Sequence, residues 1–290
     1  MFSTATTRER SARGTLTFAP ALSLLLALVG LVTPAFAAPP PSGEAPRPKL
    51  LSPWQSSKAT LFASLATDLG IIYARPRLTL GYGAPFWHFV GLDTYVMTTN
   101  SFASAYVGWR ASLPFLDALM GVRRVYPYDR RFMAPAGSHD GDDIDLGTGD
   151  ERSVYNAVDF ELVGLAPALH GAFFLSLHPV WIDAPTDRHV YEEVLRAVIV
   201  PPFALGLRGG YVFGLGESQD VKAGIMLEYV VTPGRSSNTV RAGPVALVTF
   251  SQYWEGLAAF SPVFAGPDQL GVVHGAYAFL GLLHRWAQRF

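Results

Sequence analysis

The sequence contains no cysteine and little charge. Without cysteine it can hold no disulfide framework, no thiolate zinc site and no cysteine nucleophile. Charged residues make up 16% of its 290 residues, whereas an average domain has about 25%. The net charge is −1, so the chain offers no basic surface and we expect no nucleic-acid partner. Half of the residues are apolar, which excludes a disordered chain.

The first residues have the pattern of an export signal. Three arginines precede an apolar run over residues 21–32: Arg8, Arg10 and Arg13. Pro34 and the small-x-small sequence Ala35-Phe36-Ala37 follow this run. The pattern predicts a cleaved signal peptide over residues 1–37. An uncleaved anchor is the alternative, but the run is shorter than the about 20 residues of a membrane span.

A proline-rich stretch follows the predicted cleavage site. Residues 38–54 carry too much proline for regular structure, so we expect an extended tether in the periplasm. Nothing after this stretch has the composition of a linker. Residues 55–290 are therefore predicted to form one domain.

Two-residue alternation runs through this domain and predicts β-strands. In residues 221–231 apolar side chains occupy the odd positions, and Lys222 and Glu228 occupy even ones. A strand places these two charges on one face, whereas a helix would scatter them. The pattern predicts an all-β chain of about 12 strands (range 10–14), each near the length of a tilted membrane strand. We place them at 57–66, 71–81, 87–98, 103–112, 118–126, 154–165, 170–181, 189–200, 203–214, 221–231, 239–253 and 271–284.

The two faces of these strands differ in composition. One face carries leucine, valine and aromatic residues, and the other carries glycine, serine, threonine and single charges. These faces suit the lipid side and the polar interior of a narrow transmembrane antiparallel β-barrel with up-and-down order. A soluble sandwich with its apolar face inward is the alternative. The charges predicted to line the lumen are Arg77, Arg110, Arg123, Asp159, Glu161, Arg208, Lys222, Glu228, Arg241 and Arg285.

Aromatic residues near the segment ends and at the end of the sequence support the barrel. Leu282, Trp286 and the final Phe290 share one phase of the last strand. This pattern resembles the assembly signal of bacterial outer-membrane β-barrels, although His284 and Gln288 depart from it. The resemblance implies a porin-like architecture in the outer membrane of a Gram-negative bacterium. It also implies two partners, the outer-membrane lipid and the barrel assembly machinery, and it identifies no subfamily.

Loop lengths provide a test of the strand order. Outer-membrane barrels keep both termini in the periplasm and have their longer loops outside. The longest predicted connections, 127–153 and 254–270, are the fifth and the eleventh, so both fall on the outer side. A helical membrane protein is the alternative for the apolar stretches 162–182 and 242–266. Two prolines in each stretch argue against such helices.

The first long loop holds a cluster of acidic residues. Its carboxylates are hard oxygen ligands of the kind that Ca²⁺ prefers. The residues proposed for this metal site are Asp140, Asp142, Asp143 and Asp145. Ile144 and Asp145 break the EF-hand spacing, so a solvated acidic loop is the alternative. We expect no other cofactor.

No catalytic motif accompanies these strands. The sequence lacks the Gly-x-Ser-x-Gly elbow, the His-Glu-x-x-His motif and a phosphate-binding loop. It therefore favours a narrow passive pore or a transporter for small or lipidic solutes, without excluding an enzyme. The alternatives are a barrel enzyme acting on lipid or envelope polymer, and a structural or adhesive barrel presenting its outer loops. The solute and the oligomeric state are not fixed by the sequence.

Overall fold

The computed structural model describes residues 58–71, 73–128, 132–144, 154–168, 171–216, 219–270 and 277–290. The predicted signal peptide and the predicted tether lie outside the described residues.

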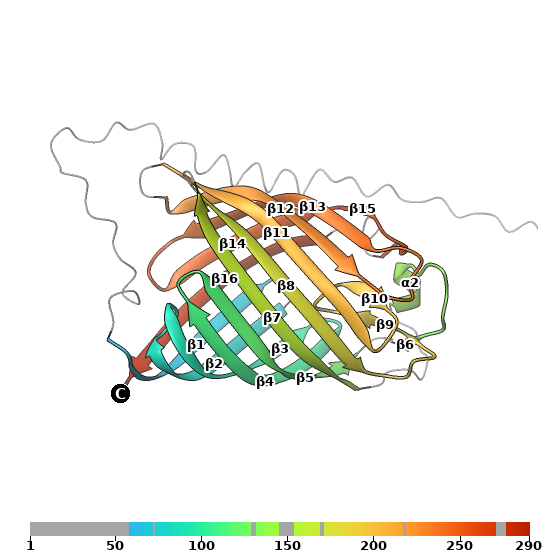
Figure 1. Cartoon of the computed structure of the whole chain (residues 1–290), viewed down its shortest axis with the longest axis horizontal. Helices are drawn as coiled ribbons and strands as arrows, with labels where there is room; N and C mark the ends of the chain where they lie inside the picture. The colour runs from blue at the N-terminus through green and yellow to red at the C-terminus, as the bar shows by residue number, and fades with distance from the viewer. Residues whose placement is uncertain are drawn as a thin grey trace, which may run out of the picture. The chain divides into compact units, whose positions relative to one another are not determined.

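The described residues form a closed antiparallel β-barrel (Figure 1). Each wall strand pairs with its neighbours in sequence order, and β16 closes the ring by pairing with β1, for example at Leu65 and Trp286. The prediction of a barrel with 12 wall strands is therefore confirmed. The wall strands are β1 (Thr60–Gly70), β2 (Tyr73–Ala84), β3 (His88–Thr99), β4 (Phe102–Leu113), β5 (Leu116–Pro127), β7 (Tyr155–Ala168), β8 (Gly171–Asp183), β11 (Phe203–Leu215), β12 (Val221–Val231), β13 (Thr239–Thr249), β14 (Trp254–Ser261) and β16 (Tyr277–Arg289).

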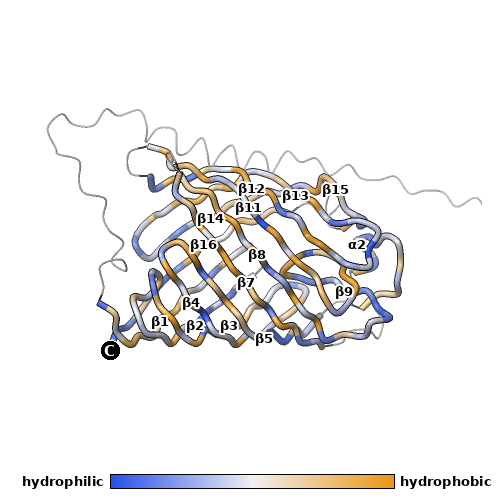
Figure 2. The backbone as a smooth tube through the Cα atoms, viewed as in Figure 1, coloured by the Kyte–Doolittle hydropathy of each residue, from blue (hydrophilic) through white to orange (hydrophobic). Residues whose placement is uncertain are grey.

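Burial alternates along the wall strands as the sequence predicts. On β2, Leu80 and Tyr82 on the outward face are 52% and 55% exposed, whereas the inward Thr79 is buried. Apolar and polar residues alternate along most wall strands (Figure 2). Contact with lipid requires an outer surface of exposed, large apolar side chains.

The two ends of the barrel have different connections. Thr60 and Phe290 lie at the end with short connections, such as residues 85–87 and 114–115. The long connections lie at the opposite end, over residues 128–154, 184–202, 232–238 and 262–276. Loop 127–153 therefore lies at the end of the barrel opposite Thr60 and Phe290, as the order of the strands predicted.

Two strand predictions are wrong. One predicted wall strand is not in the wall and one wall strand was predicted as a loop, so the number of wall strands stays at 12. Residues 189–200 form no wall strand, and the predicted loop 254–270 contains the wall strand β14. Both phases of residues 189–200 mix apolar residues with single charges such as Glu192 and Glu193, and alternation cannot tell a strand of the wall from one inside the barrel. The small residues Gly256, Ala258 and Ala259 give β14 too little contrast between its faces.

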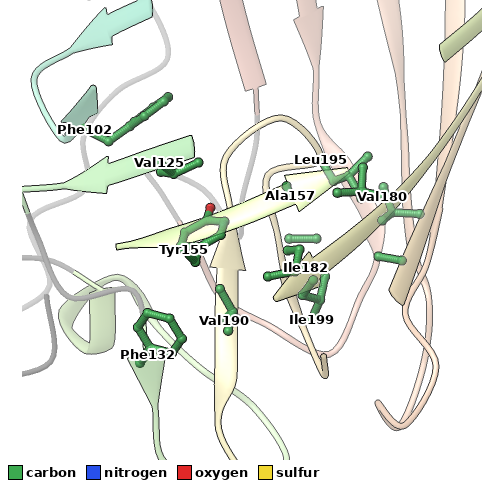
Figure 3. Packing of buried hydrophobic residues seen from close by; sticks show 13 residues of the cluster. Phe102, Val125, Phe132, Tyr155, Ala157, Val180, Ile182, Val190, Leu195 and Ile199 are labelled. Carbon is green, nitrogen blue, oxygen red and sulfur yellow. The ribbon is translucent and has the colours of Figure 1, made fainter. Parts of the chain in front are cut away.

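Residues 189–200 instead form a hairpin within a small second sheet. Its strands are β9 (His189–Glu192) and β10 (Ala197–Ile199), and β9 also pairs with β6 (Phe132–Met133). Val190 and Ile199 of this hairpin pack against inner-face residues of β7 and β8, such as Tyr155 and Ile182 (Figure 3). The connection between β8 and β11 is thus folded into the barrel.

The stretches considered for membrane helices, 162–182 and 242–266, contain wall strands instead, so the helical alternative is wrong. A one-turn helix, α2, covers Gly141–Ile144. No helix in the part of the chain that the structure describes is long and apolar enough to cross a membrane. A short strand, β15 (Val263–Ala265), pairs with β13 beside the closed ring.

Candidate functional site

The first contact between the hairpin and the wall is a buried cluster around Arg123. Arg123 on β5 donates from Nε to Asp159 Oδ2 on β7 at 2.7 Å and from Nη2 to Oδ1 at 3.1 Å. Its Nη2 also donates to Glu192 Oε1 of the hairpin at 2.6 Å. Both Arg123 and Glu192 are fully buried. A buried guanidinium is stable only with such partners, so the wall provides a fixed anchor for Glu192.

The second contact lies around Arg241 on β13. Its Nη1 donates to Glu228 Oε2 on β12 at 3.1 Å, and to the carbonyl oxygen of Leu195 at 3.2 Å. Its Nη2 donates to the carbonyl oxygen of Arg196. Arg208 on β11 completes the group by donating to Glu228 Oε1 at 2.8 Å. Arginine donors of the wall therefore hold the backbone of the hairpin turn.

These two contacts lie on nearly opposite walls. Five steps around the ring separate β5 from β13, in the order β5, β7, β8, β11, β12, β13. Between them, Leu195 lies over Gly206 of β11, where an added Cβ would be 2.7 Å from Leu195 Cδ2. The tip of the hairpin, residues 192–196, therefore spans the lumen and narrows it.

Other inner-face charges pair with carboxylates of the wall instead of the hairpin, and they remain partly accessible to water. Arg110 pairs with Asp117 at 3.1 Å, and Arg75 pairs with Asp68. Arg285 forms two hydrogen bonds with Glu255, at 3.1 and 2.7 Å. The side chains of Arg75, Arg110 and Arg285 are 36%, 21% and 29% exposed.

The remaining predicted lumen charges lie on the same inner strand faces. Ser176 donates to Glu161 at 3.4 Å. Arg77 and Lys222 make no ion pair with any residue that the structure describes. The structure therefore brings Arg123, Asp159, Arg208, Glu228 and Arg241 together around the hairpin, and it leaves Arg77, Arg110, Glu161, Lys222 and Arg285 outside that group.

The predicted lumen charges do not include several of the carboxylates that complete these pairs. Glu192 was part of a predicted wall strand, and nothing in the sequence connects it with Arg123. Asp68 and Asp117 could be identified as partners from the sequence, because each lies seven residues from its arginine across a tight turn. Two strands joined by such a turn place Asp68 directly opposite Arg75 and Asp117 diagonally opposite Arg110.

The inner face also carries an apolar cluster that the predicted polar interior did not include. Its members come from six neighbouring wall strands, and we call this cluster the apolar belt. The apolar belt consists of Phe174, Val212, Met226, Val245, Leu257, Ala259 and Phe279. It shares no member with the cluster that packs on the hairpin.

At the loop end, a polar cluster ties four connections together. His139 Nε2 and His189 Nδ1 lie 2.9 Å apart, and Arg235 Nη1 is 3.0 Å from His189 Nδ1. Asp268 accepts hydrogen bonds from Arg235 and from the backbone N–H of His139. Burial, with Arg235 and His139 nearby, lowers the pKa of His189 to about 4. Burial also raises the pKa of Asp268, although Arg235 opposes this shift.

The predicted calcium residues are only partly described. Asp140 and Asp143 each accept a hydrogen bond from the other's backbone N–H, at 3.2 and 3.1 Å. Asp145 and the side chain of Asp142 lie outside the described residues. Among the residues that are described, no group of three or more histidines and carboxylates could hold a metal ion. A calcium site in this loop therefore stays a prediction.

His178 and His284 lie on wall strands, and the residues of the predicted assembly signal lie at the end of the last wall strand. His178 Nε2 lies 3.5 Å from Asp159 Oδ1 on the inner face. The ring of His284 lies against Trp254, with centroids 4.6 Å apart. Trp286 and Phe290 are exposed on the outward phase of β16, and the N–H of Phe290 donates to the carbonyl oxygen of Leu61.

Comparisons with known proteins find similar solved structures. No family model matches the chain, and no curated protein matches it. The KdgM porin is similar with a TM-score of 0.42 and 10% identity, over 77% of this chain and 98% of that one. The translocator domain of the autotransporter NalP from Neisseria meningitidis has a TM-score of 0.41 and 13% identity, over 94% and 97%. The loop L8 deletion mutant of OmpT, an outer membrane protein of Vibrio cholerae, has a TM-score of 0.37 and 9% identity, over 79% and 99%.

Proposed function

We propose that this outer-membrane β-barrel is a narrow pore for small solutes, and that its free lumen runs beside the inward-folded hairpin. The observation that carries the proposal is the difference in water access between two groups of inner-face charges. Arg123 and Arg241, which hold the hairpin, are 0% and 2% exposed. Arg75 and Arg285, which pair with carboxylates of the wall, are 36% and 29% exposed in their side chains.

This difference favours a pore over a filled barrel. A barrel whose interior served only to stabilise the wall would bury both groups of charges. A pore needs a path along which water and charged side chains remain in contact. The hairpin then acts as a constriction, because its tip is held from both sides of the lumen at a fixed place.

No specific observation favours a barrel enzyme. Three of the described histidines are His139, His178 and His284. They contact Asp143, Asp159 and Trp254, respectively.

Planar-bilayer conductance tests the proposal with three forms of the protein. The first is the parent chain, and the second has residues 188–200 replaced by a short glycine-serine linker. The third is a matched control in which the exposed residues 134–138 are replaced by glycine and serine. Folding of each form is checked by the faster migration of the unboiled barrel on an SDS gel.

We expect a small, steady conductance from the parent, an unchanged one from the control and a severalfold larger one from the form without the hairpin. If the parent and the form without the hairpin both fold and neither conducts, the pore proposal is wrong. Equal conductance with and without the hairpin would overturn its role as the constriction.

A further inference from the structure

The apolar belt is an unusual surface for the inside of a membrane barrel. Phe174, Val212, Leu257 and Phe279 are only partly buried, and their side chains lie on the inner face. The lumen of a pore is ordinarily polar, and apolar side chains in contact with water are unfavourable. A ligand with an apolar chain would remove this surface from water.

The hairpin does not cover this surface. The residues that pack on the hairpin come from β4, β5, β7, β8, β11 and β12, and they include Val125, Val180 and Val230. None of them belongs to the apolar belt. The partly buried Leu257 and Phe279, on β14 and β16, are therefore not covered by the hairpin.

A cation that forms no ion pair with the residues that the structure describes lies beside the belt. Lys222 is on the inner face of β12, four residues before Met226, so their Cα atoms are about 13 Å apart along the strand. Its cross-strand neighbours are Gly214 and Leu247, which carry no charge. Lys222 makes no ion pair with any described residue, whereas Arg208, Arg241 and Arg285 on the inner faces of other strands are all paired with carboxylates.

The direction of access follows from the fold. Lys222 is the second residue of β12, at the barrel end that has the short connections. The opposite end holds the hairpin and the tied loops. A ligand with its charged head at Lys222 and its chain along the apolar belt would have its head towards the end with the short connections.

We propose that the lumen binds a single-chain fatty carboxylate, with its carboxylate at Lys222 and its chain on the apolar belt. The proposal rests on the proposed pore and names the chemical class of its solute. Two features of the wall carry it together, since a lone lysine would favour any small anion and the belt alone would favour any apolar molecule.

Competition binding tests the proposal on the full folded chain, held in a detergent-free amphipathic polymer. A dansyl-labelled undecanoic acid is the fluorescent probe, and the competitors are laurate, dodecanol and butyrate. Laurate is expected to compete best. Dodecanol should compete about tenfold less well, because it lacks one charge-assisted hydrogen bond. Butyrate, which has the head without the chain, should not compete.

Variants separate the two parts of the site. Lys222→Gln is expected to weaken laurate about tenfold and to leave dodecanol unchanged. Met226→Gln, of similar size but polar, is expected to weaken both competitors. Lys58→Gln, an exposed lysine before β1, is the matched control and should change neither.

Equal competition by laurate and dodecanol in the parent, or an unchanged laurate affinity in folded Lys222→Gln, would overturn the proposal. Conductance separates the two proposals, since a conducting barrel that ignores laurate refutes only the ligand class. A silent barrel that still binds laurate with this dependence on Lys222 refutes only the pore.

Discussion

Replacing Glu192 by glutamine is expected to loosen the hairpin without removing any atom of its packing. Glu192 Oε1 accepts from Arg123 Nη2 at 2.6 Å, and Oε2 accepts from the N–H of Leu195 at 2.7 Å. A glutamine amide has one acceptor oxygen, so its NH₂ group must face one of these two donors whichever way it is turned. One of the two hydrogen bonds is therefore lost.

The magnitude follows from the burial of this site. Glu192 is fully buried, so water cannot replace the lost partner. A hydrogen bond to a charged group contributes about 1.5–3 kcal/mol. A loss of about 2 kcal/mol corresponds to a roughly 30-fold larger population of the released hairpin.

Hydrogen–deuterium exchange of peptides covering residues 188–200 measures this population. We expect exchange about 30-fold faster in Glu192→Gln than in the parent. The matched control is Glu255→Gln, which breaks a two-bond arginine pair away from the hairpin and should leave the exchange of these peptides unchanged. Unchanged exchange in Glu192→Gln would refute the anchoring role of Glu192. Equal acceleration in both variants would show a general loosening of the barrel.

Three further predictions concern packing, pH and assembly. Gly108→Ala is expected to destabilise the barrel by about 1–3 kcal/mol, because an added Cβ would lie 2.4 Å from the carbonyl oxygen of Met120. Gly137→Ala, which has open space around it, should leave the thermal midpoint of the gel shift unchanged. Equal midpoints for Gly108→Ala and Gly137→Ala would contradict this reasoning. The lowered pKa of His189, about 4 against an ordinary 6.5, means that the released loops bind more protons than the tied loops between these values. The contribution of His189 to the contacts among the loops should therefore be fully present above pH 6.5 and be lost as the pH falls to 4, with amide exchange over residues 232–238 that is faster than its intrinsic pH dependence; exchange that follows only the intrinsic pH dependence would refute this. Phe290→Ala is expected to lower the amount of barrel assembled in cells and to leave refolding of the purified chain unchanged, so an equal loss in both assays would contradict an assembly signal.

The wall of the barrel could be predicted from the sequence because lipid and lumen impose opposite demands on alternate residues. The strand over residues 221–231 has the predicted bounds, since Lys222 and Glu228 mark one face and Ile225 and Leu227 mark the other. Such contrast is local, and a single strand contains all of it.

The hairpin and its anchors could not be predicted in the same way. Val190, Val198 and Ile199 make residues 189–200 resemble a wall strand, because a strand inside the barrel is also buried and apolar. The partner of Glu192 lies 69 residues away in the sequence. Only the closed ring brings Arg123 to it, and alternation contains no information on such distant pairs.

The apolar belt shows a second limit of pattern reasoning. Met226 and Val245 lie on inner faces that also carry Glu228 and Arg241, so the faces were assigned to a polar lumen by their charges. Whether neighbouring apolar side chains join into one surface depends on the register between strands, which the three-dimensional pairing determines.

The most direct test of the central claim is a crosslink between the hairpin and the inner wall. The chain has no cysteine, so Leu195→Cys with Gly206→Cys introduces the only two thiols. An added Cβ at Gly206 would lie 2.7 Å from Leu195 Cδ2, so the Cβ atoms of residues 195 and 206 are at most about 5 Å apart, near the range of a disulfide. We expect the oxidised pair to form in outer-membrane samples, while Leu195→Cys with Gly164→Cys, whose second thiol is on the outward phase of β7, stays reduced. Two free thiols at positions 195 and 206, both labelled by a maleimide in the folded barrel, would contradict a hairpin held inside the lumen.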